Sequence, residues 1–100
     1  MSNSELSNLR LSALRALLGA IPTSLRAYSV EFSGQVIRAR SVFDETWIDE
    51  HKELLSVVGT EIVSDFHTAF TIEEEFLSVP KSEPMENLAH LIYLRHEARA

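Results

Sequence analysis

Four histidines are the side chains of this 100-residue chain best suited to act as acids, bases or metal ligands. They are His51, His67, His90 and His96. No pair has the His-Glu-x-x-His or a comparable ligand spacing that zinc sites use. His90 and His96 would share one face of a strand, but six residues of extended chain cover about 20 Å. The histidines therefore predict no metal site, and His51 is better interpreted as a hydrogen-bonded histidine at the core boundary.

Three consecutive glutamates, Glu73 to Glu75, are the second group that could do acid or metal chemistry. Neighbouring side chains of a strand point to opposite faces, so these carboxylates cannot converge on one ion. The simpler interpretation is a solvated sheet edge on which Glu73 or Glu75 pairs with Arg38 or Arg40. A charged strand of this kind also protects an exposed sheet edge from aggregation.

Other catalytic arrangements are missing from the sequence. The chain has no cysteine for thiol chemistry, and its three glycines form no phosphate-binding loop. No serine stands in a nucleophile elbow. We therefore predict no catalytic residue, no cofactor and no metal, and no enzyme. A small enzyme remains the least favoured alternative, with a carboxylate–histidine site drawn from Glu73, Glu75, His90 or His96.

The element that would position any functional side chain is a long amphipathic helix from Thr46 to Phe66. Apolar residues recur there at three- and four-residue spacing, which places them on one helix face. They are Trp47, Ile48, His51, Leu54, Leu55, Val58, Ile62 and Phe66. Thr46 and Asp49 resemble a capping box. Gly59 inside the helix indicates close packing against a strand or the first helix.

One surface of this helix could bind a partner. Val57 lies away from the apolar face, Glu50, Glu53 and Glu61 surround it at helical spacing, and Leu54 borders it. An apolar residue framed by acids can form the centre of a protein-binding patch. A single exposed valine is also ordinary, so the two interpretations are equally weighted.

A first helix is expected from Ser4 to Leu18, ended by Gly19. Its apolar stripe would be Leu6, Leu9, Leu14, Leu17 and Leu18, with Ala13 and Ala16 allowing close approach.

A hairpin is expected from Leu25 to Asp44, with Ser33-Gly34 as its two-residue turn. That turn pairs Phe32 with Gln35, Val30 with Ile37, and Tyr28 with Ala39. This face would be buried. The opposite face, with Ala27, Glu31, Arg38 and Arg40, would meet solvent or a partner.

The remaining segments predict two more strands, one from Phe70 to Val79 and one from Asn87 to about His96. Glu74 interrupts the alternation of the first, so either it lies at the edge of the core or a bulge shifts the strand. The second is almost continuously apolar, as expected for a strand buried on both faces or at the sheet centre. Residues 97–100 would form a charged tail.

The order α-β-β-α-β-β predicts an α+β fold, a four-stranded, mainly antiparallel sheet with both helices on one face, in a single domain of residues 1–100.

The formal net charge of −6 disfavours nucleic-acid and anionic membrane partners and permits a basic protein partner. No apolar run reaches the roughly 20 residues of a membrane span, and Glu5 and Arg15 argue against an export signal. The absence of cysteine is compatible with the cytoplasm.

Several stretches together resemble a family of small bacterial immunity proteins from contact-dependent growth inhibition and related polymorphic toxin systems. They are Leu14–Gly19 with Pro22, Leu25–Glu31, the hairpin end at Phe43-Asp44, Thr60–Phe66, Ile72–Phe76 and Leu91–Arg95. The turn Ser33-Gly34 replaces the Asp-Gly of the family pattern. The resemblance implies stoichiometric binding of a cognate toxin domain in the cytoplasm, with the toxin often a basic nuclease, and it carries over no binding residues.

The predicted partner-binding residues are therefore Glu50, Glu53, Val57 and Glu61. The rival surface is the open sheet face with Glu31, Arg38, Arg40 and one or more of Glu73 to Glu75. A regulatory or adaptor domain is the alternative function. The sequence leaves the oligomeric state and the strand order open.

Overall fold

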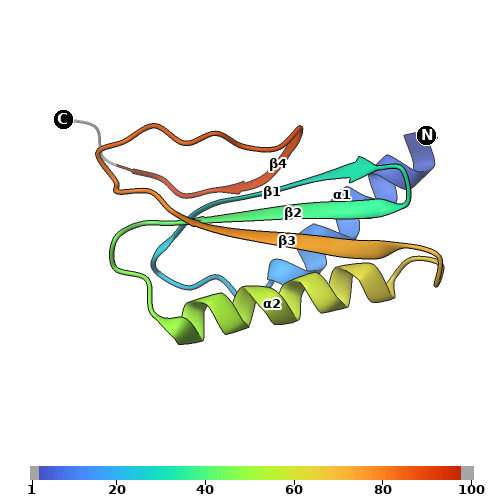
Figure 1. The fold of residues 1–100 in the computed structure, drawn as a ribbon, viewed down its shortest axis with the longest axis horizontal. Helices are drawn as coiled ribbons and strands as arrows, with labels where there is room; N and C mark the ends of the chain where they lie inside the picture. Colours follow the sequence, from blue (N-terminus) through green and yellow to red (C-terminus); the bar gives the residue numbers. More distant parts are fainter. Residues whose placement is uncertain (1–2, 98–100) are drawn as a thin grey trace.

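The computed structural model describes residues 3–97 and contains two helices and four strands (Figure 1). Their order along the chain confirms the predicted α-β-β-α-β-β arrangement and the α+β class. The elements are α1 (Asn3–Leu17), β1 (Leu25–Ser33), β2 (Val36–Phe43), α2 (Asp49–Ser64), β3 (Thr71–Ser78) and β4 (His90–Leu94). No helix within residues 3–97 combines the length and the apolar character that crossing a membrane requires.

The four strands form one mixed sheet in the order β3-β2-β1-β4. β1 is antiparallel to both β2 and β4, whereas β2 and β3 are parallel. Parallel neighbours need a crossover connection, which α2 supplies between them. The prediction of a mainly antiparallel sheet thus holds for two of the three strand pairs.

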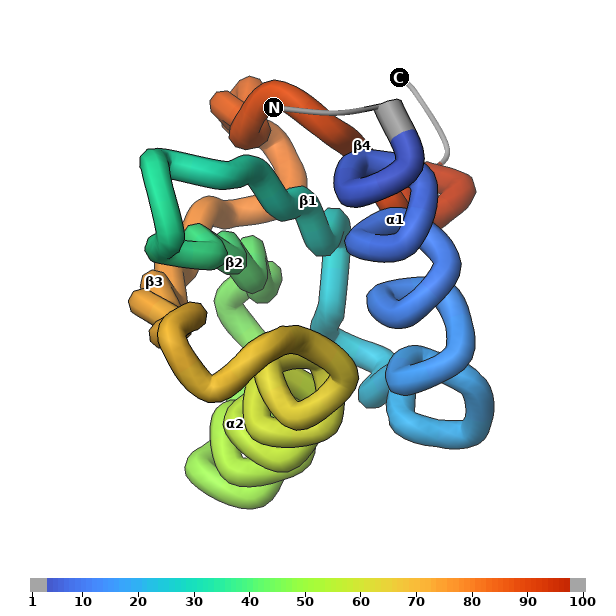
Figure 2. Tube along the Cα trace, turned by 90° about the vertical axis from the view of Figure 1, so that its right-hand side faces the viewer, coloured from blue at the N-terminus to red at the C-terminus, as the bar shows by residue number. Residues whose placement is uncertain are grey.

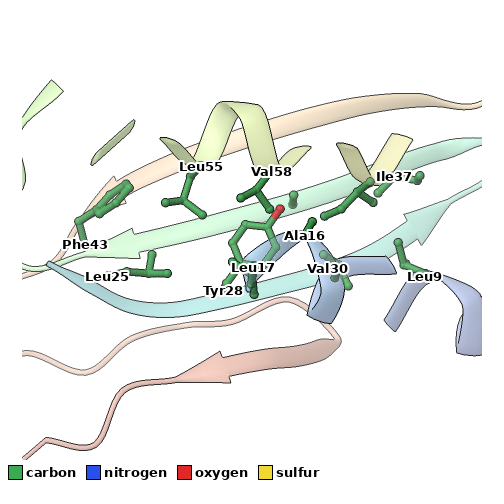
Figure 3. Close-up of a cluster of buried hydrophobic side chains, with 13 residues drawn as sticks. Leu9, Ala16, Leu17, Leu25, Tyr28, Val30, Ile37, Phe43, Leu55 and Val58 are labelled. Carbon is green, nitrogen blue, oxygen red and sulfur yellow. The ribbon is translucent and has the colours of Figure 1, made fainter. Parts of the chain in front are cut away.

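Both helices cover the same face of the sheet, as predicted (Figure 2). One apolar cluster joins α1, α2 and the inner faces of β1 and β2 (Figure 3). Its largest fully buried side chains include Leu9 of α1, Tyr28 and Val30 of β1, Ile37 of β2, and Leu55 of α2. Phe32, Phe66 and Phe70 close one end of this core, with ring centroids 5.5 to 5.8 Å apart.

The orientation predicted for α1 is wrong at two of its leucines. Leu14 is 51% exposed and Leu18 is 79% exposed, while Ala13 and Ala16 are buried beside Leu17. Small alanines let the helix backbone approach the sheet closely, and the larger leucines then fall on the outer side. The helix stop is confirmed: Gly19 has φ 74°, a conformation that glycine adopts without steric cost.

The hairpin turn lies one residue later than predicted, at Gly34-Gln35. Gly34 has φ 60°, and no described non-glycine residue has positive φ, so Gly34 takes the first central position of a type II′ turn. Phe32 consequently faces Ile37, and Val30 faces Ala39. Each partner is shifted by two positions, and two is the side-chain period of a strand. The predicted inner face is therefore correct although its pairing is wrong.

The outer face of the sheet is not open, contrary to expectation. The connection between β3 and β4, residues 79–89, lies over it on the side away from the helices (Figure 2). The Leu88 backbone N–H donates to Ser29 Oγ at 2.9 Å. Ala27, Ser29 and Val42 are buried in consequence. Small and apolar residues on this face are the reason that a loop can pack there.

The predictions for β4 and for the start of α2 also need correction. β4 is an edge strand, with Leu91 and Leu94 exposed, and is neither central nor buried on both faces. Thr46 does not cap α2, since its N–H and its hydroxyl both donate to Asp44 Oδ1, at 2.8 and 2.6 Å. Ile48 stands at the N-cap without a side-chain hydrogen bond.

Candidate partner-binding surface

The four residues proposed for partner binding lie together on the outer face of α2. Glu50, Glu53, Val57 and Glu61 are all exposed, Val57 at 56%. Their three- and four-residue spacing places them on one side of a helix that turns about 100° per residue. The opposite side of α2 carries the buried residues Leu55, Val58, Gly59 and Ile62. The structure therefore presents an apolar side chain between three carboxylates, facing away from the core.

The carboxylates of this surface are not neutralised within the described chain. None of the ion pairs among residues 3–97 involves Glu50, Glu53 or Glu61. Lys52 of the same helix turns toward the sheet, with its ammonium 5.3 Å from the centroid of the Phe76 ring. The outer face of α2 thus keeps its negative charge available to attract a cationic surface.

Two polar contacts hold α2 in its place against the rest of the protein. Ser24 Oγ lies 2.7 Å from His51 Nδ1, which confirms that His51 is a hydrogen-bonded boundary histidine. At the other end, Ser12 Oγ of α1 donates to Asp65 Oδ2 at 2.6 Å. Both contacts fix the rotation of α2, and with it the direction of the acidic face.

Gly59 of α2 lies directly against the Glu74 side chain of β3. A Cβ at this position would overlap the Glu74 side chain, so the prediction of close packing against a strand is confirmed. The register between β2 and β3 runs without a bulge, which places Glu74 at the edge of the core. Burial raises the pKa of the Glu74 carboxyl, and a hydrogen bond from Ser56 opposes this shift.

The carboxylate–histidine site of the enzyme alternative does not form. Glu73 and Glu75 lie on β3, and His90 lies on β4, at the opposite edge of the sheet. Three strand spacings separate these edges by about 14 Å. Glu75 is instead paired with Arg40 at 2.6 Å, as the solvated-edge interpretation predicts. Within residues 3–97 no group of three or more His, Asp and Glu side chains is placed to hold a metal ion.

The rival binding surface on the outer sheet face has its charges already paired. Arg38 donates to Glu31 at 3.1 Å, and Arg40 donates to the backbone oxygen of Glu86 as well as to Glu75. The Ala89 backbone N–H binds the remaining Glu31 oxygen. These groups hold the 79–89 connection on the sheet, and a partner would have to displace it to reach them.

Arg26 is the most important polar residue that the sequence reasoning missed. It is 3% exposed and forms a bidentate fork with Glu97 at 2.8 and 2.9 Å. Its remaining donors bind backbone oxygens of the connection, those of Val79, Pro80, Lys81 and Glu83. An arginine between the apolar residues Leu25 and Ala27, at the start of a strand, is the signal that could have revealed this network.

Arg95 completes the network and corrects the prediction of a charged tail. It donates to Asp44 Oδ2 at 2.8 Å and to Glu97 Oε2 at 2.9 Å. The hydrogen bond from Arg26, supported by Arg95, lowers the pKa of Glu97 to about 2. Glu97 therefore belongs to the folded structure, and residues 98–100 of the expected tail lie outside the described part. Both guanidiniums that line the neighbouring cavity of about 890 Å³ already hold Glu97.

Comparison with models of protein families identifies a match. The family model described as MafI2 immunity protein matches residues 6–97, which include all six helices and strands except the first turn of α1. The search of curated proteins found no match.

Proposed function

Since the chain belongs to the MafI2 immunity protein family, we propose that it protects by binding a cognate toxin domain one-to-one through the outer face of α2. The resemblance to immunity proteins inferred from the sequence is thereby confirmed. The observation that supports this surface is Val57, 56% exposed and framed by carboxylates that have no ion pair among residues 3–97. The proposed site of action is the cytoplasm.

The chemistry of the α2 face suggests a basic toxin, and a nuclease in particular. Nucleases bind phosphates with lysine and arginine side chains, and carboxylates can occupy the same cations. Glu50 and Glu61 stand eleven residues apart, which extends the acidic face over roughly 16 Å of helix. Val57 between them would supply the desolvated centre, while the surrounding charges speed association. The toxin would be inhibited because its substrate path is covered.

The test measures the affinity of the purified protein for its cognate toxin domain. Val57→Arg should weaken binding by roughly a hundredfold or more, because it places a cation at the centre of the contact. Glu50→Lys with Glu61→Lys should slow association and flatten its salt dependence. Matched controls are Ser82→Arg and Glu83→Lys with Glu86→Lys, which introduce the same charges on the exposed connection of the opposite layer.

A titration of toxin activity separates inhibition by binding from an enzymatic mechanism. Inhibition should be complete at one protein per toxin, whereas an enzyme would act below that ratio. If Val57→Arg binds normally and Arg38→Glu or Arg40→Glu abolishes binding, the outer sheet face is the site and the α2 proposal is wrong.

A further inference from the structure

α1 and the turn residue that follows it carry an apolar outer surface that the proposed function does not use. Leu11, Leu14 and Leu18 are 47%, 51% and 79% exposed, and they follow one another at three- and four-residue spacing. We call these three residues the leucine seam. Sets of adjacent exposed leucines mark interaction surfaces more often than single ones do, and this spacing is the one that packs helices against each other.

The charges beside the seam restrict what can cover it. Arg10 and Arg15 are exposed, stand next to Leu11 and Leu14 in the sequence, and take part in none of the ion pairs among residues 3–97. Two α1 helices packed seam to seam would bring the arginines of one against those of the other, which is unfavourable. The complement is an apolar surface bordered by carboxylates.

The chain itself contains such a surface. Leu54 and Val57 of α2 are 37% and 56% exposed, and Glu50, Glu53 and Glu61 border them. An arginine-flanked seam and a carboxylate-framed apolar patch are thus present on two helices of one molecule. Their apolar centres match in kind, and their borders have opposite charge.

We propose that a second copy of this chain covers the leucine seam, with α1 of each protomer packed against α2 of its partner. The two helices lie side by side in one layer, connected by the hydrogen bond from Ser12 to Asp65. Two protomers related by a two-fold axis can therefore form both contacts at once. In this dimer the second copy covers Val57 of α2. On the premise of the proposed function, dimer and toxin compete for α2, and toxin binding releases a protomer.

Self-association is tested by sedimentation velocity of the whole chain over a range of concentrations at low salt. Arg10→Glu with Arg15→Glu should lower the affinity of dimerisation by roughly tenfold or more. Glu50→Arg with Glu53→Arg should do the same, since each pair reverses the charge around one of the two apolar patches. An equimolar mixture of these two variants should restore a dimer that contains one copy of each, because both contacts again join opposite charges. Circular dichroism checks that every variant is folded.

Three results would overturn the proposal: a parent protein that stays monomeric at millimolar concentration, a dimer unaffected by the α2 variant, or a mixture that does not associate. Leu14→Glu separates this proposal from the toxin proposal. It should abolish the dimer while the affinity for the toxin is retained or raised, because the competing copy is gone. If Leu14→Glu weakens toxin binding and the parent is monomeric, the leucine seam belongs to the toxin interface.

Discussion

At the scale of single residues, the stability of this protein depends on a few charged side chains that join distant parts of the chain. Arg26 and Glu97 stand 71 positions apart, and Arg95 and Asp44 stand 51 apart. A bidentate pair between a buried guanidinium and a carboxylate is among the stronger polar contacts, and removing one member leaves the other charge without its partner. The pairs hold β1, β4 and the 79–89 connection together.

Glu97→Gln should reduce the free energy of unfolding at neutral pH and make that free energy depend less on pH. The hydrogen bond from Arg26 holds the folded pKa of Glu97 at about 2, against an ordinary value of 4.5. Because the folded pKa lies below the unfolded one, the ionised carboxylate stabilises the protein at pH values above about 4.5. That contribution is lost as the pH falls toward 2. Urea unfolding at pH 7 and pH 3 should therefore show a smaller difference for the variant than for the parent. Glu83→Gln, on an exposed side chain, should leave the difference unchanged.

At the scale of elements, neighbouring residues of the same type have different roles because of how each element is rotated or offset. Leu17 is the last residue of α1 and Leu18 follows it, yet Leu17 is 3% exposed and Leu18 is 79% exposed. Ser33 ends β1 and Gly34 begins the turn, and only Gly34 requires a positive φ. Substitutions at such adjacent positions report directly on the geometry of the element.

Leu17→Ala should destabilise the protein by about 2 to 5 kcal/mol, the range for a buried leucine that leaves a cavity. Leu18→Ala should change stability by less than about 0.5 kcal/mol, because its side chain already meets water. Chemical denaturation at low protein concentration, where self-association does not contribute, compares the two. Equal losses from both variants would contradict the outward orientation of Leu18.

Gly34→Ala should cost about 1 to 2 kcal/mol, because an L side chain is strained in the left-handed region at φ 60°. Ser33→Ala should be nearly neutral, since Ser33 is an exposed last residue of β1. Denaturation of Ser33→Gly decides between the two possible turns. Glycine at the end of a strand should cost about 0.5 to 1 kcal/mol, whereas a gain in stability would favour the turn predicted from the sequence, in which residue 33 takes positive φ.

At the scale of the whole molecule, one apolar cluster connects both helices with the sheet, and the 79–89 connection forms a third layer over the outer face (Figure 2). No part of the described chain has a core of its own. We therefore propose that the chain is a single domain, as the sequence predicts. This common core holds the outer face of α2 and the leucine seam in a fixed position relative to each other.

Unfolding should accordingly be a single cooperative transition. Trp47, 40% exposed at the start of α2, reports on that end of the molecule by fluorescence, and far-ultraviolet circular dichroism reports on all helices and strands. The two signals should give the same urea midpoint. Separate midpoints would show that the end of the molecule around Trp47 unfolds independently of the rest.

The sequence by itself determined the kind and order of the elements, the inner face of the hairpin and the exposure of Val57. These properties depend on local periodicity, which is present in any window of a few residues. The partner residues Glu50, Glu53, Val57 and Glu61 are found on one exposed face for the same reason. Their binding role itself stays a prediction.

Only the tertiary structure decided the outward turn of Leu14 and Leu18, the edge position of β4, and the burial of Arg26. Hydrophobicity gives both leucines the same weight as Leu17, but the distance to the sheet favours small alanines on the inner side. Strand order and the Arg26–Glu97 pair depend on segments far apart in sequence, whose approach is governed by the packing of the whole chain. A local pattern contains no information about which distant segment will meet it.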